Sequence, residues 1–377
     1  MKKIAIANRT NLKNYGSVLQ VYALCEVVKN LGYDVEAIWE TGNLSKNYDF
    51  RPNKIISTGC KLLTHPRLLK STLSNIRYVQ QHIISEQTIQ MFDSFVNSHI
   101  KRTFYPAKMM KQCKVGKVYD KFICGSDQIW CTTTLYVDPL MYLRFAPKEK
   151  RVAYAPSLGR DYIPSYSKRE MKKYIKDIPD VSVREYVGQK LIRELTGRDV
   201  PVVLDPTLLI PREEWDQIKK VHASKGEYIV CYFLNTPMEE TQQKLLKFIK
   251  KSRKIVIALN SRLEHVENEV TVLYPDCGPQ EFIGYISNAE YVLTDSYHGM
   301  LFSIIYHRQF WSIAREYGEF DQSSRQLSVL EMFGLNARYC RTQDIITEDT
   351  IDYETVQKRM DSEIEKSLNY LRRALEK

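Results

Sequence analysis

Cysteine pairs and long apolar runs are missing from this 377-residue sequence. Its eight cysteines include no CxxC pair, and several lie inside apolar runs such as FICGS and YIVCYF. This pattern favours reduced, mostly buried thiols over a disulfide framework or a zinc site, and we expect no metal. No apolar run approaches the ~18 residues of a membrane span, and MKKIAIANRT turns polar too early for a secretory signal. We therefore expect a soluble, cytoplasmic protein.

Glycine-rich phosphate loops and nucleic-acid motifs are also missing. Without a GxGxxG fingerprint, a dinucleotide cofactor is not supported, and we expect no cofactor. The net charge of +10 favours anionic partners, but the lysines and arginines are spread along the chain. Phosphorylated metabolites or anionic lipid headgroups therefore fit better than nucleic acid.

The sequence does contain a regular alternation of strand-like and helix-like segments. Residues 3–8 have the pattern of a buried strand, 17–32 of a helix that Gly32 ends, and 33–40 of a second strand. A parallel strand pair joined by a helix is the βαβ unit. A second alternating series follows a proline-flanked linker near 205–215. This pattern predicts an α/β fold with two Rossmann-like domains facing a cleft.

The alternation also suggests where the domains begin and end. We expect an N-terminal domain over 1–207, a C-terminal domain over 208–350 and a helical tail over 351–377. Residues 43–115 are basic and helical in period with weak strand signals, so we expect an insertion or helical layer there. Within it, the leucine-rich stretch 60–85 can rest on anionic headgroups, making a peripheral contact with the inner membrane face. We favour the alternative that this stretch packs on the domain as an ordinary amphipathic helix.

Ligands of open α/β sheets bind beyond the carboxyl ends of strands, where helix N-termini offer free N–H groups. The segment NYGS (14–17) lies at such a position and is either a plain helix start or a ligand loop. GSDQ is similar: Ser126 or Asp127 can cap a helix, or the acid can bind a sugar hydroxyl. Arg184 follows a buried strand, and its guanidinium suits a carboxylate or phosphate. The alternative for Arg184 is a salt bridge, for example to Glu185 or Asp205.

His298 is the most informative residue. It follows the strand-like YVLT and the polar pair Asp295–Ser296, and it precedes Gly299, whose missing side chain lets a ligand approach the backbone. At a helix N-terminus, an imidazole can bind a phosphate and transfer a proton. A packing or capping role is the alternative, and Asp295 is better explained as a helix cap than as a group that orients a sugar.

Several of these motifs occur together in a fixed order. They are NYGSVLQVYAL, FICGSDQIW, YAPSLG, SVREYVGQKLI, VVLDPTLL, LTDSYHGMLFSIIYHRQF and SRQLSVLEMFGL. The set resembles the polysaccharide pyruvyl transferase family and covers the chain from residue 3 to about 340, except 43–115. The resemblance implies a GT-B-like fold. It also implies transfer of pyruvate from phosphoenolpyruvate onto two hydroxyls of a sugar, in a cell-surface polysaccharide or its lipid-linked precursor.

The resemblance also implies roles for single residues. His298 matches the family's histidine before glycine and is the candidate acid or base, and Arg184 matches its donor-binding arginine. Ser296 stands where many members carry an arginine, so donor recognition depends more on Arg184, Arg315 or Arg325. The candidate donor site comprises Arg184, Ser296, Tyr297, Gly299 and Arg325. The candidate acceptor site comprises Asn14, Tyr15, Gly16, Ser126 and Asp127.

Two other functions stay open at this stage. A nucleotide-sugar glycosyltransferase on the same scaffold needs an acidic residue for the donor ribose, for which Asp276 and Glu281 are weak candidates. A non-catalytic sugar- or phosphate-binding member of the family is the other.

Overall fold

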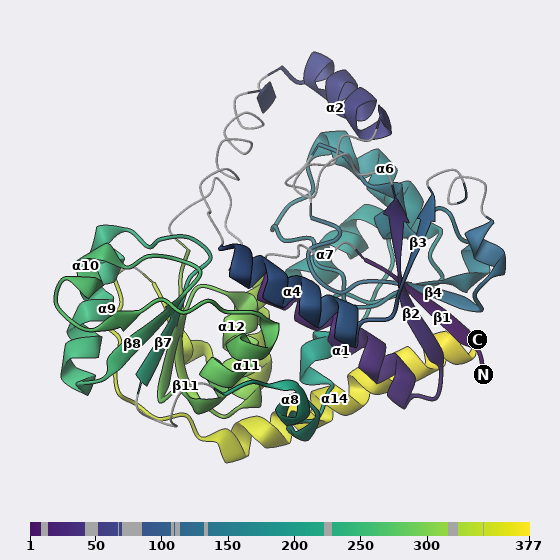
Figure 1. Ribbon diagram of the computed structural model, residues 1–377. Coiled ribbons are helices and arrows are strands. Elements are labelled where there is room, and N and C mark those ends of the chain that lie inside the picture. Colours follow the sequence, from purple (N-terminus) through teal and green to yellow (C-terminus); the bar gives the residue numbers. More distant parts are fainter. Residues whose placement is uncertain are drawn as a thin grey trace.

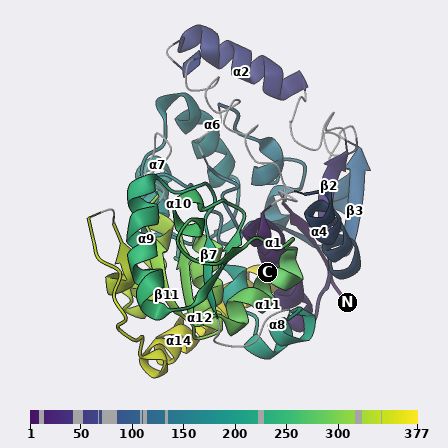
Figure 2. The same cartoon turned by 60° about the vertical axis from the view of Figure 1, so that its left-hand side comes forward.

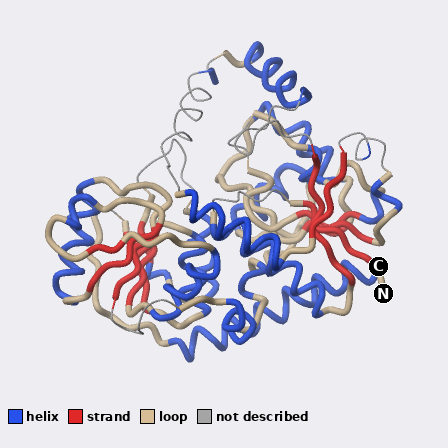
Figure 3. Tube along the Cα trace, viewed as in Figure 1, coloured by secondary structure: helices blue, strands red, loops and turns tan. Residues whose placement is uncertain are grey.

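The computed structural model describes residues 1–8, 14–41, 52–66, 68–69, 85–106, 109, 114–131, 135–221, 228–315, 323–341 and 343–377. Within these ranges, the strands form two six-stranded parallel sheets, each in its own α/β unit (Figures 1 and 3). The first sheet has the order β3-β2-β1-β4-β5-β6 and the second the order β9-β8-β7-β10-β11-β12. Both orders are the Rossmann order, so each sheet has a switch point between its first and fourth strands.

The first unit begins as the sequence predicts. Asn14 caps α1 by accepting from the backbone N–H of Ser17 at 3.0 Å, and Gly32 follows the helix with a φ of +89°. Its strands are β1 Lys3–Ala7, β2 Asp34–Thr41, β3 Arg102–Pro106, β4 Lys121–Cys124, β5 Arg151–Ala153 and β6 Asp180–Val181. Its helices include α1 Tyr15–Asn30, α2 Pro52–Thr64, α4 Glu86–His99, α6 Ser165–Lys176 and α7 Tyr186–Thr196, with 3-10 turns at Val115–Lys117, Pro139–Tyr142 and Lys148–Lys150.

The second unit repeats this plan after a short connection. Its strands are β7 Tyr228–Tyr232, β8 Ile255–Leu259, β9 Val272–Leu273, β10 Tyr291–Thr294, β11 Gln309–Ile313 and β12 Tyr339–Cys340. Its helices include α8 Arg212–Ile218, α9 Glu239–Ser252, α10 Glu264–Glu267, α11 Pro279–Asn288, α12 Tyr297–Ile305 and α13 Ser324–Phe333, with 3-10 turns at Pro206–Leu208 and Asn336–Arg338. The carboxyl ends of β7 and β10 place the start of α12 at the switch point of this sheet.

An aromatic core joins the two units. The ring of Tyr15 stacks between Phe92 of α4 at 5.2 Å and Phe282 of α11 at 4.5 Å. The last helix, α14 Tyr353–Glu376, runs from the second unit back along the first, and the two chain ends lie close together (Figure 1). On the first unit, the hydroxyl of Tyr370 donates to the carbonyl of Ala153 at 3.1 Å. The units therefore share one packed interface.

The two-domain α/β fold is confirmed, while several local expectations are wrong. The segment 102–106 lies inside the expected insertion, yet it is the edge strand of the first sheet. No helix starts at GSDQ, where Ser126, Asp127 and Gln128 form a bend. The expected linker near 205–215 is largely buried and contains a 3-10 turn and the start of α8. The domain boundaries remain predictions. In the described part of the chain, no helix combines the length and apolarity needed to cross a bilayer.

Candidate active site

A buried carboxylate, Asp205, connects the residues that follow the two switch points. Nη1 of Arg184 lies 2.6 Å from Asp205 Oδ2, and the hydroxyl of Ser126 donates to the same oxygen at 3.0 Å. Nη2 of Arg184 lies 3.2 Å from Asp127 Oδ1. Arg184 and Asp205 are fully buried, so each charge depends on the other for stabilisation.

His298 approaches the same carboxylate from the second unit. Its Nε2 lies 3.7 Å from Asp205 Oδ2, and only 7% of its side chain is exposed. Burial by itself would raise the pKa of Asp205, but His298 and Arg184 outweigh that effect and hold the pKa well below its ordinary value. The carboxylate therefore stays ionised at neutral pH.

The first turn of α1 closes the other side of the imidazole. A Cβ atom at Gly16 would lie 1.9 Å from His298 Nδ1, so only glycine leaves room for the ring. Because α1 belongs to the first unit and α12 to the second, this contact fixes the histidine across the interface.

Tyr297 lies between two guanidinium groups. Its ring centre is 4.5 Å from Cζ of Arg184 and 5.7 Å from Cζ of Arg325. Three buried groups here have no hydrogen-bond partner among the described residues: Arg184 Nε, the Tyr297 hydroxyl and His298 Nε2. Each of them can donate to an anion, and buried polar groups are rarely left without a partner.

Arg325 is buried close to two other arginines. Burial, followed by the charges of Arg315 and Arg184, lowers the pKa of Arg325 to about 10. A bound anion would relieve this crowding. The arrangement thus combines a histidine held by a carboxylate with converging cationic groups, which suits proton transfer to an anionic substrate.

A model of the polysaccharide pyruvyl transferase family matches residues 14–317. The chain belongs to this family. The matched range includes Gly16, Asp127, Arg184, Asp205 and His298, which form the network around the buried carboxylate. None of the curated proteins matches the chain.

Several solved structures are similar to this chain over most of its length. MnaA of S. aureus, in a co-structure with UDP, is 11% identical with a TM-score of 0.50, over 98% of this chain and 90% of that chain. UDP-GlcNAc 2-epimerase from Neisseria meningitidis is 9% identical with a TM-score of 0.47, over 99% and 94%. Acinetobacter baumannii MurG is 10% identical with a TM-score of 0.43, over 99% and 92%. At such identities the likeness concerns the fold, which is GT-B-like.

Among the candidate acceptor residues of this pyruvyl transferase family member, Gly16, Ser126 and Asp127 join the network described above. Two others do not. Asn14 caps α1, and Tyr15 is buried in the interface core, where its hydroxyl donates to the carbonyl of Cys277 at 3.2 Å. Both side chains have structural roles, and that of Tyr15 is buried.

The start of α12 differs from expectation in two ways. Ser296, not Asp295, caps the helix, with its hydroxyl 3.4 Å from the backbone N–H of Gly299. Asp295 instead accepts from the backbone N–H of Leu234 at 2.8 Å. A Cβ at Gly299 would lie 2.6 Å from Thr294 Oγ1, so this glycine serves internal packing rather than close approach of a ligand.

Asp205 is the functional candidate that the sequence did not single out. The sequence indicated Asp205 only as one possible ion-pair partner of Arg184, and in the structure Arg184 pairs with both Asp205 and Asp127. The sequence feature that marks the position of Asp205 is the motif VVLDPTLL. The turn after it explains the position, because Thr207 donates to Asp205 Oδ1 through its backbone N–H at 3.1 Å and its hydroxyl at 2.9 Å.

The acids considered for a nucleotide-sugar donor have other roles. Asp276 accepts from Thr88 Oγ1 at 3.3 Å and from the hydroxyl of Ser85 at the start of α4. Glu281 accepts from the backbone N–H of Gly278 at 3.1 Å in the capping box of α11. Among the described residues there is no cluster of three or more histidine, cysteine or acidic side chains that would hold a metal.

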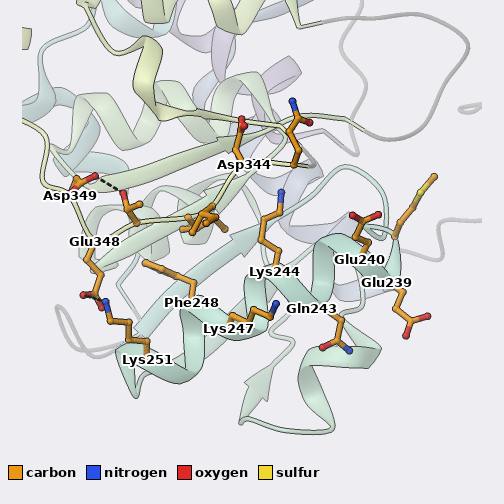
Figure 4. Close-up of a pocket in the computed structure, with 15 residues that line it drawn as sticks. Glu239, Glu240, Gln243, Lys244, Lys247, Phe248, Lys251, Asp344, Glu348 and Asp349 are labelled. Carbon is orange, nitrogen blue, oxygen red and sulfur yellow. Dashed lines mark hydrogen bonds and ion pairs between the residues drawn. The ribbon is translucent and has the colours of Figure 1, made fainter.

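A hollow of about 1230 Å³ lies elsewhere, between α9 and residues 343–349 of the second unit (Figure 4). Three lysines of α9 line it. Lys251 pairs with Glu348 at 2.7 Å, and Lys244 donates to the carbonyl of Arg341 at 2.6 Å. Local acceptors thus hold two of the three cations, and the lining residues include none of those around Asp205.

Proposed function

We propose that this protein transfers pyruvate from phosphoenolpyruvate onto two hydroxyls of one sugar unit in a cell-surface polysaccharide or its lipid-linked precursor. The products are a cyclic ketal and inorganic phosphate. Family membership supports the reaction class. The observation that carries the residue assignments is that His298 and Arg184, from different units, face the same oxygen of Asp205.

The proposed reaction begins with proton transfer to carbon. Protonated His298 donates a proton to the methylene carbon of phosphoenolpyruvate, which leaves an oxocarbenium-like centre at the neighbouring carbon. One sugar hydroxyl adds to that centre and loses its proton to the imidazole. The second hydroxyl then replaces phosphate, which departs with the remaining proton. The ionised carboxylate of Asp205 lies 3.7 Å from Nε2 of His298 and positions the imidazole for these transfers.

We assign the donor to the side of the Tyr297 ring on which Arg325 lies. Arg184 directs both of its terminal nitrogens to carboxylates, so its main role is to position Asp205 and Asp127. Arg325 and Arg315 supply guanidinium groups that can bind a phosphate and a carboxylate. The N-terminus of α12 adds the partial positive charge of its free N–H groups.

The acceptor is assigned to the side of Asp127. Burial alone would raise the pKa of Asp127. The charges of Arg184 and His298 have the larger, opposite effect, so the pKa lies below its ordinary value. An ionised carboxylate with 23% of its side chain exposed can accept hydrogen bonds from sugar hydroxyls. Its low pKa suits orientation of the hydroxyl rather than removal of its proton.

We place the reaction in the cytoplasm. Seven cysteines in the described ranges are free thiols, and five of them are buried. Thiols in this form are compatible with a reducing compartment.

The experiment that tests this function compares two products. The protein is incubated with a panel of sugar acceptors and either phosphoenolpyruvate or sugar nucleotides. We expect acceptor-dependent release of phosphate from phosphoenolpyruvate and no release of nucleoside diphosphate. Nucleoside diphosphate release alone would contradict the proposal and favour a glycosyltransferase. Binding of phosphoenolpyruvate without turnover on any acceptor would favour a non-catalytic role.

A further inference from the structure

Helix α2 turns its apolar side away from the protein. None of its residues is buried, and Ile55, Ile56 and Leu63 are 56%, 64% and 85% exposed. Cys60 is also exposed, so Ile56, Cys60 and Leu63 form a stripe at helical spacing. Figures 1 and 2 both show α2 at the outer edge of the molecule, beyond α6.

The polar side of α2 faces the protein instead. Lys61 is only 14% exposed, lies 2.8 Å from Glu170 Oε2 and donates to the carbonyl of Leu135 at 2.7 Å. The ring of His65 lies edge-on to Tyr166 of α6 at 5.7 Å. An amphipathic helix on a globular protein normally has the opposite orientation. The reversal leaves a row of large apolar side chains in need of a partner.

Helix α6 beside it is strongly basic. Its single acid is Glu170, which is paired with Lys61. Its exposed cationic residues are Lys168, Arg169, Lys172, Lys173 and Lys176. An apolar stripe next to a cluster of exposed cations is the combination that binds the headgroup region of an anionic membrane.

We propose that α2 and α6 together form a docking surface for an anionic lipid bilayer, here named the α2–α6 face. The stripe Ile56, Cys60 and Leu63 enters the headgroup region, and the cations of α6 bind the lipid phosphates. A second copy of the chain fits this face less well. A two-fold contact would bring the five cations of each α6 toward those of the other. This inference does not depend on the identity of the donor.

The test is vesicle flotation of the full chain at low and high salt. One set of vesicles contains phosphatidylcholine alone, and the other contains equal amounts of phosphatidylcholine and phosphatidylglycerol. We expect binding to the anionic vesicles only, and release at high salt. Binding to neither set, or equal binding to both, would overturn the proposal.

Surface variants assign the binding to this face. The pair Ile56→Ser and Leu63→Ser should weaken partitioning by about tenfold or more, because two apolar side chains no longer enter the bilayer. The pair Lys172→Ala and Lys173→Ala should weaken it by about 30-fold. The matched control Ile345→Ser removes an isoleucine that is 79% exposed on the second unit, and should leave binding unchanged.

Two further measurements separate this proposal from its alternatives. All variants should keep the wild-type melting temperature and the wild-type rate of phosphate release with a soluble acceptor, since the substituted side chains are exposed. Sedimentation without lipid should show the same mass for wild type and variants. A loss of self-association in the α2 pair, with vesicle binding intact, would instead identify the partner as a second copy of this chain.

Discussion

The two sides of Tyr297 differ in their balance of charge. On one side, Arg184 is paired with Asp205 and Asp127, and His298 faces the same acids. On the other side, burial, followed by the charges of Arg315 and Arg184, lowers the pKa of Arg325 to about 10. The balanced side holds its charges in pairs and positions the histidine. The positive side is suited to an anion, so its charges should serve binding more than stability.

The largest effect should come from the balanced side. Asp205→Asn removes the carboxylate that Arg184 and His298 share, which leaves a buried guanidinium with too little counter-charge. We expect a loss of about 3 kcal/mol or more in the free energy of unfolding, measured by urea denaturation. Asp127→Asn is the matched control and should cost less than half as much, because water reaches its side chain. Equal small losses for both would remove the distinction between the two acids.

His298→Gln tests whether the balanced side performs the chemistry. We expect phosphate release from phosphoenolpyruvate to fall about 10²–10⁴-fold, because glutamine cannot transfer the proton. The affinity for phosphoenolpyruvate and the melting temperature should stay near wild type. The control His265→Gln changes a histidine at the start of α10 and should keep full activity. Unfolding of His298→Gln with no specific loss of turnover would mark the residue as structural.

Arg325→Met tests the positive side. The affinity for phosphoenolpyruvate should fall about 10- to 100-fold, because a charged hydrogen-bond donor is lost. Arg325→Met should cost less stability than Arg184→Met, since burial and neighbouring cations already disfavour the charge of Arg325. Arg184→Met should destabilise the protein more, because it removes the guanidinium that pairs with both Asp205 and Asp127. Equal destabilisation by the two substitutions would contradict the proposed difference between the sides.

Gly16→Ala tests the fit of the two units around His298. The added methyl group would overlap the imidazole, so the ring or the helix must shift. We expect a cost of about 1–3 kcal/mol in stability and a fall in turnover with little change in donor affinity. The control Gly59→Ala places a methyl group in open space on α2, so it should cost no stability and leave turnover and donor affinity unchanged. Wild-type turnover in Gly16→Ala would show that the position of the imidazole is not restrained by α1.

Acid titration should reveal the smallest effect. The pKa of Asp205 is lower in the folded chain than its unfolded value of about 3.9, so the unfolded chain binds the proton first. The resulting stabilisation is fully present above about pH 4 and is lost as the pH falls below it. Urea denaturation at a series of pH values should therefore show wild type and Asp205→Asn converging at acid pH. Parallel curves would contradict the assignment of the low pKa to Asp205.

Local pattern predicted the fold well but predicted less of the site. The helix 17–32 and its stop at Gly32 follow from periodicity and from the preference of glycine for positive φ. The strand 102–106 escaped prediction because an edge strand of five residues with arginine and proline has no apolar run. Neither GSDQ nor the linker near 205–215 has a local signal for the tertiary contacts that determine its conformation.

The site depends on contacts between distant segments. Asp205 and His298 lie on different units, so no spacing in the sequence joins them. The orientation of α2 was equally hidden, because periodicity is the same whether an apolar face points inward or outward. The favoured expectation that the stretch 60–85 packs on the domain is wrong for residues 60–64, none of which is buried. Arg67, Lys70 and Arg77 of that stretch lie outside the described residues.

Calorimetric titration of the wild-type protein with phosphoenolpyruvate, and separately with a sugar nucleotide, tests the central claim most directly. If a small anionic donor occupies the space between His298 and Arg325, phosphoenolpyruvate should bind with one molecule per chain, and the sugar nucleotide should give no heat of binding. Saturable binding of the sugar nucleotide with no binding of phosphoenolpyruvate would contradict the account.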